Sequence, residues 1–345
     1  MSQIKRNIIN YNLQGKSYVK LVERAKLLVP DVEGLRNSVE NSFLKSGIDN
    51  IFIEELRNVI LFVETENHLA RIYPIIVAFF KDSYRLSAEE KVDILSVFIS
   101  NCLAHQSVDL ARNIWNLEET KNYRRKNTYA KYYTLLYRLE YYEEILRDFE
   151  MSPDITILRE HQGFLLVVAA LCKIGNQGAL NKLSELIPSP KSNFQEHHTR
   201  SVCMYAWLAM KLGNYGLAYD LTNKCLNTAL TMNVKLSILT EAGRLKDALL
   251  CLRMHLNNRA KCISSREKKN TFRINFETMK KLTDQVKNEG NENLTKDFVL
   301  LCSALDSQAE IVDGSLEEML FSITEKRFSR SISSSPGNTI RTNKK

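Results

Sequence analysis

The segments CMYAWLAMKLGNYGLAYDLTNKCL (203–226) and NVKLSILTEAGRLKDALLCLRMHL (233–256) decide the fold, because they repeat one pattern at a distance of thirty residues. In each segment an apolar run with helical spacing reaches a glycine, Gly213 or Gly243, and a second apolar run follows. Glycine adopts the positive φ that ends a helix without steric cost. Each segment is therefore predicted to form a helical hairpin, and such hairpins must stack to bury their apolar faces.

The same pattern recurs in the preceding part of the chain. Copies lie at 95–117, 129–151 and 164–186, and a weaker copy lies at 54–76. The aligned second-helix positions are small or apolar, with a mean separation close to 36 residues: Ala70, Ala111, Ile145, Leu180, Ala218 and Ala248. A helical bundle would also contain hairpins that end in glycine, but the regular spacing favours a repeat array. We predict an all-α fold, an α-solenoid of stacked helical hairpins of the pentatricopeptide or tetratricopeptide type.

Changes in composition divide the chain into four parts. We expect a basic N-terminal arm and first helix at 1–48, and the helical-repeat array at 49–256. A basic linker and a C-terminal helical cap follow at 257–326, where helical periodicity continues but the repeat pattern stops. Residues 327–345 form a basic, serine-rich tail without apolar periodicity, which predicts disorder.

Two local signals concern the first repeats. Pro74 lies inside the second helix of the weak copy and predicts a kink or an early N-terminal boundary there. Ser87, with Glu90 three residues later, has the spacing of a capping box and predicts the start of a helix.

The net charge of +8 is unevenly distributed. Basic stretches at 1–26 (+5), at 257–273 (+5) and from Lys326 to the end (+6) leave a net charge of −8 for the rest. The total favours a nucleic-acid partner, whereas the acidic remainder is also compatible with a protein partner. The first 22 residues contain no acidic residue, which fits either a mitochondrial presequence or an exposed basic arm.

The sequence contains no recognisable motif of an enzyme, cofactor or metal site. A phosphate-binding glycine loop, GxSxG and HExxH are all missing, and His197–His198 near Cys203 lack the spacing of a zinc site. No apolar run is long enough to span a membrane. The seven cysteines include no CxxC pair, which predicts buried thiols in a reducing compartment: Cys102, Cys172, Cys203, Cys225, Cys251, Cys262 and Cys302. We therefore expect a non-catalytic protein with no catalytic residue, no cofactor and no metal.

One stretch combines basic and aromatic residues, KNYRRKNTYAK at 121–131. Arg124, Arg125 and Lys126 stand at the expected start of a helix, and Tyr129 follows. Basic side chains contact phosphates and aromatic rings stack on bases, so this stretch is a candidate RNA site. The alternative is a solvated turn between two repeats.

Short motifs resemble two repeat families. The stretch Trp207–Ala218 looks like the tetratricopeptide consensus. Thr128–Ala130 resembles the start of a pentatricopeptide repeat, Leu171–Gly175 resembles its turn, and Ala242–Leu249 resembles its turn and second helix. The pentatricopeptide assignment fits the motifs better.

The layout of the chain is similar to one animal mitochondrial family, pentatricopeptide repeat domain-containing protein 2. The similarity covers roughly residues 12–325 and includes the degenerate repeats, the stretch Asp313–Glu317 and the short basic tail. The resemblance implies localisation in the mitochondrial matrix and single-stranded mitochondrial RNA as a partner, with RNA-processing proteins as further partners. It also implies a part in mitochondrial RNA maturation and so in respiratory-chain function.

In this repeat class a few side chains of each hairpin read one base. The resemblance places the main reading position ten residues before the turn, on Glu55, Ser96, Ala130, Leu165, Cys203 and Asn233. Few of these can hydrogen-bond to a base, so we expect RNA binding of modest specificity. The candidate RNA-binding residues are Ser96, Arg124, Arg125, Lys126, Tyr129, Asn233, Arg266, Lys268 and Lys269. The alternative function is a protein-interaction scaffold that docks a partner protein.

Overall fold

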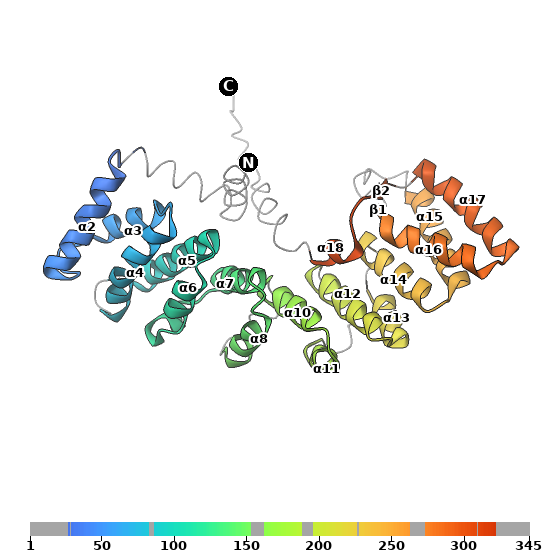
Figure 1. The fold of residues 1–345 in the computed structure, drawn as a ribbon, viewed down its shortest axis with the longest axis horizontal. Coiled ribbons are helices and arrows are strands. Elements are labelled where there is room, and N and C mark those ends of the chain that lie inside the picture. The colour runs from blue at the N-terminus through green and yellow to red at the C-terminus, as the bar shows by residue number, and fades with distance from the viewer. Residues whose placement is uncertain are drawn as a thin grey trace, which may run out of the picture. The chain divides into compact units, whose positions relative to one another are not determined.

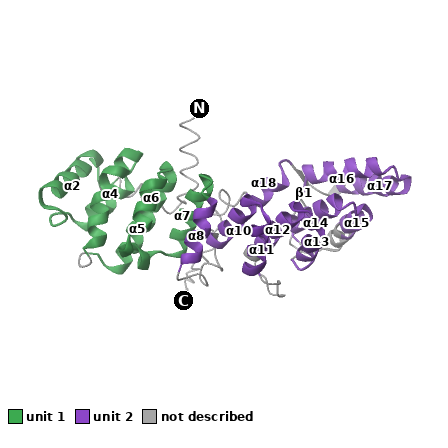
Figure 2. Cartoon of the chain, turned by 60° about the horizontal axis from the view of Figure 1, so that its bottom comes forward, with its two compact units in different colours: residues 1–141, 323–345 green, residues 142–322 purple. Residues whose placement is uncertain are grey.

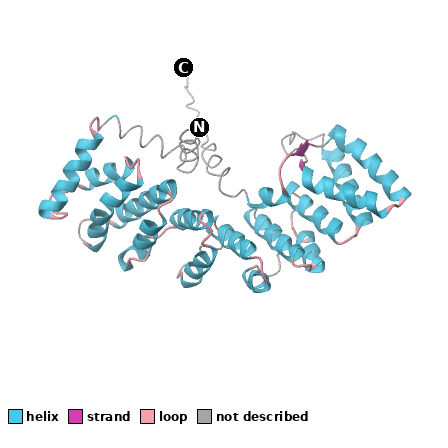
Figure 3. Cartoon of the chain, in the orientation of Figure 1, coloured by secondary structure: helices cyan, strands magenta, loops and turns pink. Residues whose placement is uncertain are grey.

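The computed structural model describes residues 27, 29–82, 86–152, 162–187, 196–225, 228–262, 273–308 and 310–321. Within these residues the chain is helical apart from one pair of three-residue strands, so the all-α prediction is confirmed (Figure 3). The helices fall into two compact units, which we call unit 1 (up to Tyr141) and unit 2 (Tyr142–Ser322) and describe separately (Figure 2). The boundary that we expected after residue 256 lies inside unit 2.

Unit 1 is a series of antiparallel helices (Figure 1). The helix α3 packs against α5, and α5 packs against α7, so the first helix of one hairpin contacts the first helix of the next. The elements of unit 1 are α2 (Val32–Ser46), α3 (Ile53–Leu61), α4 (Glu66–Lys81), α5 (Ala88–His105), α6 (Val108–Trp115), the 3-10 helix η1 (Glu118–Tyr123) and α7 (Lys126–Arg138).

Unit 2 repeats this mode of packing. Its first helices α10, α12, α14 and α16 each contact the next one, and the second helices fill the spaces beside them. The elements of unit 2 are α8 (Tyr142–Met151), α10 (Gln162–Ile174), α11 (Gln177–Leu186), α12 (Glu196–Lys211), α13 (Tyr215–Asn223), α14 (Ala229–Glu241), α15 (Leu245–Cys262), β1 (Arg273–Asn275), α16 (Phe276–Glu289), α17 (Glu292–Gln308), β2 (Glu310–Val312) and α18 (Leu316–Phe321).

The turn that ends the first helix has the same backbone geometry at five places. A residue with φ between 59° and 77° occupies it: Gln106, Glu140, Gly175, Gly213 and Gly243. At four of them the N–H of the next residue donates to the carbonyl five residues earlier, at 2.8–2.9 Å. This is the hydrogen bond of a Schellman motif. The copies are therefore alike in local structure even where glutamine or glutamate replaces glycine.

The structure predicts whether a substitution at or near these turns stabilises or destabilises the fold. We expect Gly213→Ala to destabilise unit 2 by about 1 kcal/mol, because alanine disfavours the φ of +77° found there. A β-carbon at Gly213 would meet no heavy atom within 4 Å, so the effect reports backbone strain alone. Gly216, inside α13, has equally open surroundings, and Gly216→Ala should stabilise unit 2 by about 0.5 kcal/mol.

Urea unfolding followed by ¹⁹F NMR of fluorotryptophan measures the free energy of unfolding of these two variants. The chain has two tryptophans, Trp115 in unit 1 and Trp207 in unit 2, so each resonance reports one unit. If both glycine variants changed the free energy of unfolding of unit 2 in the same direction, the result would contradict the turn geometry.

The aligned second-helix positions behave as the sequence pattern predicts, with one exception. Ala111, Ile145, Ala218 and Ala248 are fully buried, and Leu180 is 4% exposed. Ala70 in α4, by contrast, is exposed, so its assignment is wrong. The N-cap of α4 is Thr65, and the residue four positions after the cap is Leu69, which is fully buried. The weak copy was therefore aligned one residue too late.

The two local signals have different outcomes. The capping box is confirmed, since Ser87 Oγ accepts from the N–H of Glu90 and Glu90 Oε2 accepts from the N–H of Ser87. Of the two outcomes expected at Pro74, the boundary is wrong, because α4 continues through it to Lys81, and the kink stays a prediction. Proline removes one backbone donor, and the carbonyl that loses its partner belongs to the exposed Ala70, where water can replace it.

The expected cap and the last repeat hairpin share one hydrophobic core. Leu239 and Leu252 from α14 and α15 cluster with Leu282 and Leu301 from α16 and α17. The strands β1 and β2, which the sequence analysis missed, pair in parallel with Ile274 opposite Ile311. The core therefore continues across residue 256, from the last repeat hairpin into the expected cap.

Candidate functional site

Four of the six expected base-reading positions are buried, and the other two, Glu55 and Ser96, are half-buried. Ala130, Leu165, Cys203 and Asn233 are each 5% exposed or less. Cys203 in α12 contacts α14 directly, since its Sγ lies 3.7 Å from Oγ1 of Thr231. These four positions therefore do not face solvent, and Cys203 joins two neighbouring hairpins.

Asn233 illustrates the structural role of these positions. Its side-chain Oδ1 accepts from the N–H of Asn275 at 2.7 Å, and its Nδ2 donates to the carbonyl of Ala229 at 2.6 Å. Asn275 in turn caps α16, because its Oδ1 accepts from the N–H of Thr278. The prediction that Asn233 reads a base is therefore wrong for this conformation, since the amide is fully buried and hydrogen-bonded on both sides.

Ser96 is half-buried, and its polar atoms bind a neighbouring lysine. Lys131 Nζ in α7 donates to the hydroxyl of Ser96 at 2.8 Å and to its carbonyl at 3.1 Å. Burial lowers the pKa of Lys131 to about 8, and the carboxylate of Asp93 partly opposes this shift. Ser96 therefore links α5 to α7, and its expected contact with a base would require this link to break.

The basic stretch at the start of α7 divides into structural and exposed residues. The Arg124 guanidinium lies 4.5 Å from the centre of the Trp115 ring, and it donates to the carbonyl of Trp115. Tyr129 is 3% exposed and packs edge-on against Trp115, with ring centres 5.0 Å apart. These two residues stabilise the junction of α6 and α7, so the prediction that Tyr129 stacks on a base is wrong.

Arg125 and Lys126 are exposed, as an RNA contact requires. Arg125 is the N-cap of α7, and its side chain makes no capping hydrogen bond. A helix N-terminus carries partial positive charge, which adds to the two cations. The remaining candidates, Arg266, Lys268 and Lys269, lie outside the residues that the structure describes.

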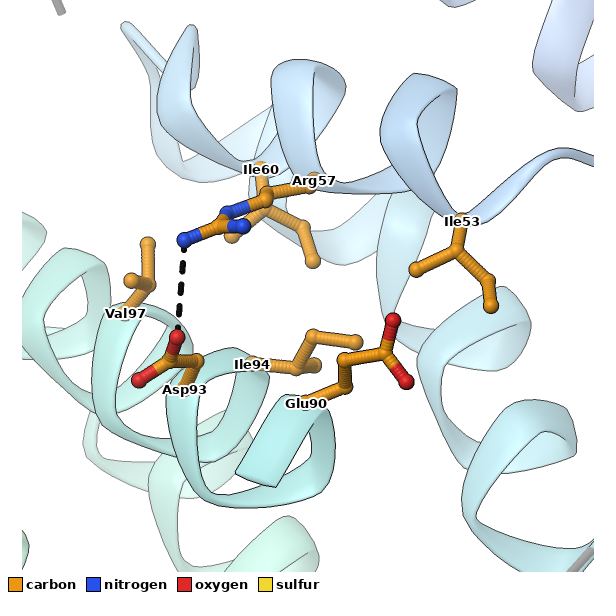
Figure 4. Close-up of a pocket in the computed structure, with 7 residues that line it drawn as sticks. All are labelled: Ile53, Arg57, Ile60, Glu90, Asp93, Ile94 and Val97. Atoms are coloured by element: carbon orange, nitrogen blue, oxygen red, sulfur yellow. Dashed lines mark hydrogen bonds and ion pairs between the residues drawn. The ribbon is translucent and has the colours of Figure 1, made fainter. Parts of the chain in front are cut away.

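A small cavity lies between parts of α3 and α5 in unit 1 (Figure 4). Arg57 reaches across it to Asp93, with Nη2 and Oδ2 3.4 Å apart, and Ile60, Ile94 and Val97 supply apolar walls. The space for water inside is about 30 Å³. A water molecule needs roughly 10–15 Å³ by the same measure, so the cavity suits a few waters and is too small for a substrate.

A second cluster of polar contacts, which the sequence analysis missed, lies in unit 2. We call it the Arg200 surface, and it consists of Lys173 from α10, Arg200 and Trp207 from α12, and Glu277 from α16. All four contact the segment of β2 and α18, and Glu277 does so by accepting from the N–H of Leu316 at 3.1 Å. No local pattern marks this surface, because its residues are separated by many hairpins. The one available signal was the basic character of Lys173 and Arg200 opposite the acidic segment LEEMLF.

The cysteines agree only partly with the expectation of buried thiols. Cys102, Cys172 and Cys203 are buried, and burial raises the pKa of the Cys102 and Cys172 thiols. Three others are half-buried: Cys225, Cys251 and Cys302. Among the described residues, His, Cys, Asp and Glu form no group of three or more that could hold a metal ion. The described helices also include none with the length and apolar character needed to cross a bilayer.

Comparison with known proteins found no match. The chain matches no protein-family model, no curated protein and no solved structure.

Proposed function

We propose that this chain is a non-catalytic RNA-binding protein of the pentatricopeptide type, whose hairpins form an α-solenoid. The observation that carries the repeat assignment is the recurrence of one turn, with positive φ, after successive first helices. The packing of first helix on first helix within each unit supports it as well. The sequence resemblance extends the proposal to the mitochondrial matrix, to single-stranded mitochondrial RNA and to a part in RNA processing and maturation.

The proposed contact with RNA is chiefly electrostatic. Arg125 and Lys126 are exposed at the N-terminus of α7, where two cations and the helix dipole attract phosphate. The four buried reading positions argue against a base-by-base code, so we propose modest sequence specificity. Arg124 acts indirectly, because its stacking on Trp115 holds the start of α7 in place.

The second candidate is a protein-interaction scaffold. The Arg200 surface favours it, since this surface already holds a peptide segment of the same chain. The two functions use different units, so they can be tested separately.

Replacing Arg125 and Lys126 with alanine tests RNA binding. We expect the slope of log affinity against log salt concentration to fall by about 1.4, because each phosphate contact on single-stranded RNA contributes roughly 0.7. Replacing both with glutamate should weaken binding further and leave the helical content unchanged. The measurement is a fluorescence-anisotropy titration of the full chain with a labelled single-stranded RNA over a series of salt concentrations.

The matched control changes the charge by the same amount elsewhere. Lys45 and Lys246 are exposed on α2 and α15, and their double substitution with glutamate should reduce affinity much less. Equal losses in the two double variants would show that only net charge matters, and an unchanged slope would remove Arg125 and Lys126 from the interface.

A further inference from the structure

The segment of β2 and α18 lies on the first helices of unit 2. Figure 1 shows α18 beside α12 and α14, and both helices contact it. Arg200 Nη2 donates to the carbonyl of Met319 at 2.7 Å, and Arg200 Nε donates to the carbonyl of Leu320 at 3.1 Å. One arginine thus binds the backbone at the C-terminal end of α18, where a helix carries partial negative charge.

The side chains of the segment fit the same surface. Lys173 forms an ion pair with Glu317, and its Nζ lies 4.9 Å from the centre of the Phe321 ring. Phe321 packs edge-on against Trp207, with ring centres 5.2 Å apart. Two leucines of the segment are buried: Leu316 (5% exposed) and Leu320 (fully buried). The surface therefore recognises a charge, an aromatic ring, apolar side chains and a helix end at once.

The segment also contains the residues that cap the N-terminus of α18. Ser315 Oγ accepts from the N–H of Glu318 at 2.9 Å, and Glu318 Oε2 accepts from the N–H of Ser315 at 2.9 Å. This reciprocal pair is a capping box, which gives partners to two backbone N–H groups at the start of the helix. Gly314, directly before it, has a φ of +112°, which favours glycine.

We propose that the Arg200 surface is a peptide-recognition site and that residues 315–321, the N-capping serine and α18, are its intramolecular occupant. The partner is a protein segment with the chemistry of α18: an acidic residue in the first turn, leucines four positions apart and an aromatic residue at the C-terminal end. Such a segment displaces α18. This inference does not depend on RNA binding by unit 1.

Hydrogen exchange of the unmodified full chain is the first test. We expect the amides of 316–321 to exchange about tenfold or more faster than those of α12, because a detachable segment opens without unfolding the helices beneath it. Exchange of both segments in a single cooperative step would overturn the proposal, since α18 would then be part of the folded core.

The second test uses a labelled synthetic peptide of residues 310–321 and the full-length double variant Leu316→Asp, Leu320→Asp, which releases α18. The peptide should bind this variant about tenfold or more tightly than it binds the unaltered chain, whose site is already occupied. Adding Arg200→Ala should remove that gain, whereas Lys246→Ala on α15 should not.

Two other outcomes of the second test would overturn the proposal. Equal affinity for the released and unaltered chains would show that the peptide does not use this surface. A gain in affinity for a single-stranded RNA instead of the peptide would make the occupant a nucleic acid. If the released variant does not fold, the hydrogen-exchange result decides. Failure of RNA binding in unit 1 would leave all these readouts unchanged.

Discussion

Asn233→Ala is expected to destabilise unit 2 by about 2–4 kcal/mol. The substitution removes two hydrogen bonds of a fully buried amide and leaves the N–H of Asn275 without its acceptor. Asn275 also caps α16 and donates from Nδ2 to the carbonyl of Gly314 at 2.7 Å. The loss should therefore spread from α14 to the start of α16 and to the segment that leads to α18.

Urea unfolding followed at the Trp207 resonance measures this loss in the free energy of unfolding of unit 2. The transition followed at Trp115 in unit 1 should not change. Asn293→Ala is the matched control, because Asn293 is exposed on α17 of the same unit, and we expect its effect to stay within about 0.5 kcal/mol. A small effect of Asn233→Ala together with a large loss of RNA affinity would restore the base-reading role that the geometry contradicts.

Lys131→Met is expected to stabilise unit 1 at pH 7 by about 1–2 kcal/mol. Burial lowers the pKa of Lys131 to about 8, so folding at pH 7 holds a charged lysine in an unfavourable place. The full shift would correspond to about 3 kcal/mol, but two things reduce the gain: solvent screens the half-buried side chain, and methionine loses the two hydrogen bonds to Ser96. Methionine keeps the apolar stem and removes the charge.

The same pKa sets the dependence on pH. Between the folded pKa of about 8 and the unfolded value near 10.4, Lys131 binds more protons in the unfolded chain than in the folded one, so its contribution to the stability of unit 1 rises with pH. The advantage of Lys131→Met should therefore shrink as pH increases from 7 to 10. Unfolding followed at Trp115 tests this, with exposed Lys45→Met as the control. An advantage that stays constant over this range would contradict the lowered pKa.

The hairpins could be predicted from sequence because their signals are local. Gly213 and Gly243 mark turns through backbone chemistry, and the spacing of apolar residues located two further turns, at Gln106 and Glu140, without any glycine. The alignment failed by one residue at Ala70, where the copy is weakest. The strands β1 and β2 are three residues long, too short for their alternation to show.

The site was harder to predict because periodicity identifies the buried face within a hairpin but not the face that meets the next hairpin. Asn233 looks like a solvent-facing polar residue, yet its partner Asn275 lies 42 residues further along the chain. Arg200 and the backbone of Met319 are 119 residues apart, so no local pattern connects them. Arg125 and Lys126 are the candidates whose predicted exposure agrees with the structure.

The most direct test of the proposed function is ultraviolet crosslinking of the tagged full-length protein in mitochondria, followed by sequencing of the attached RNA. We predict recovery of mitochondrial transcripts well above an untagged control, and a marked loss of that RNA when Arg125 and Lys126 are both replaced by glutamate. Recovery of protein crosslinks alone, with RNA at the level of the control, would contradict RNA binding and favour the scaffold.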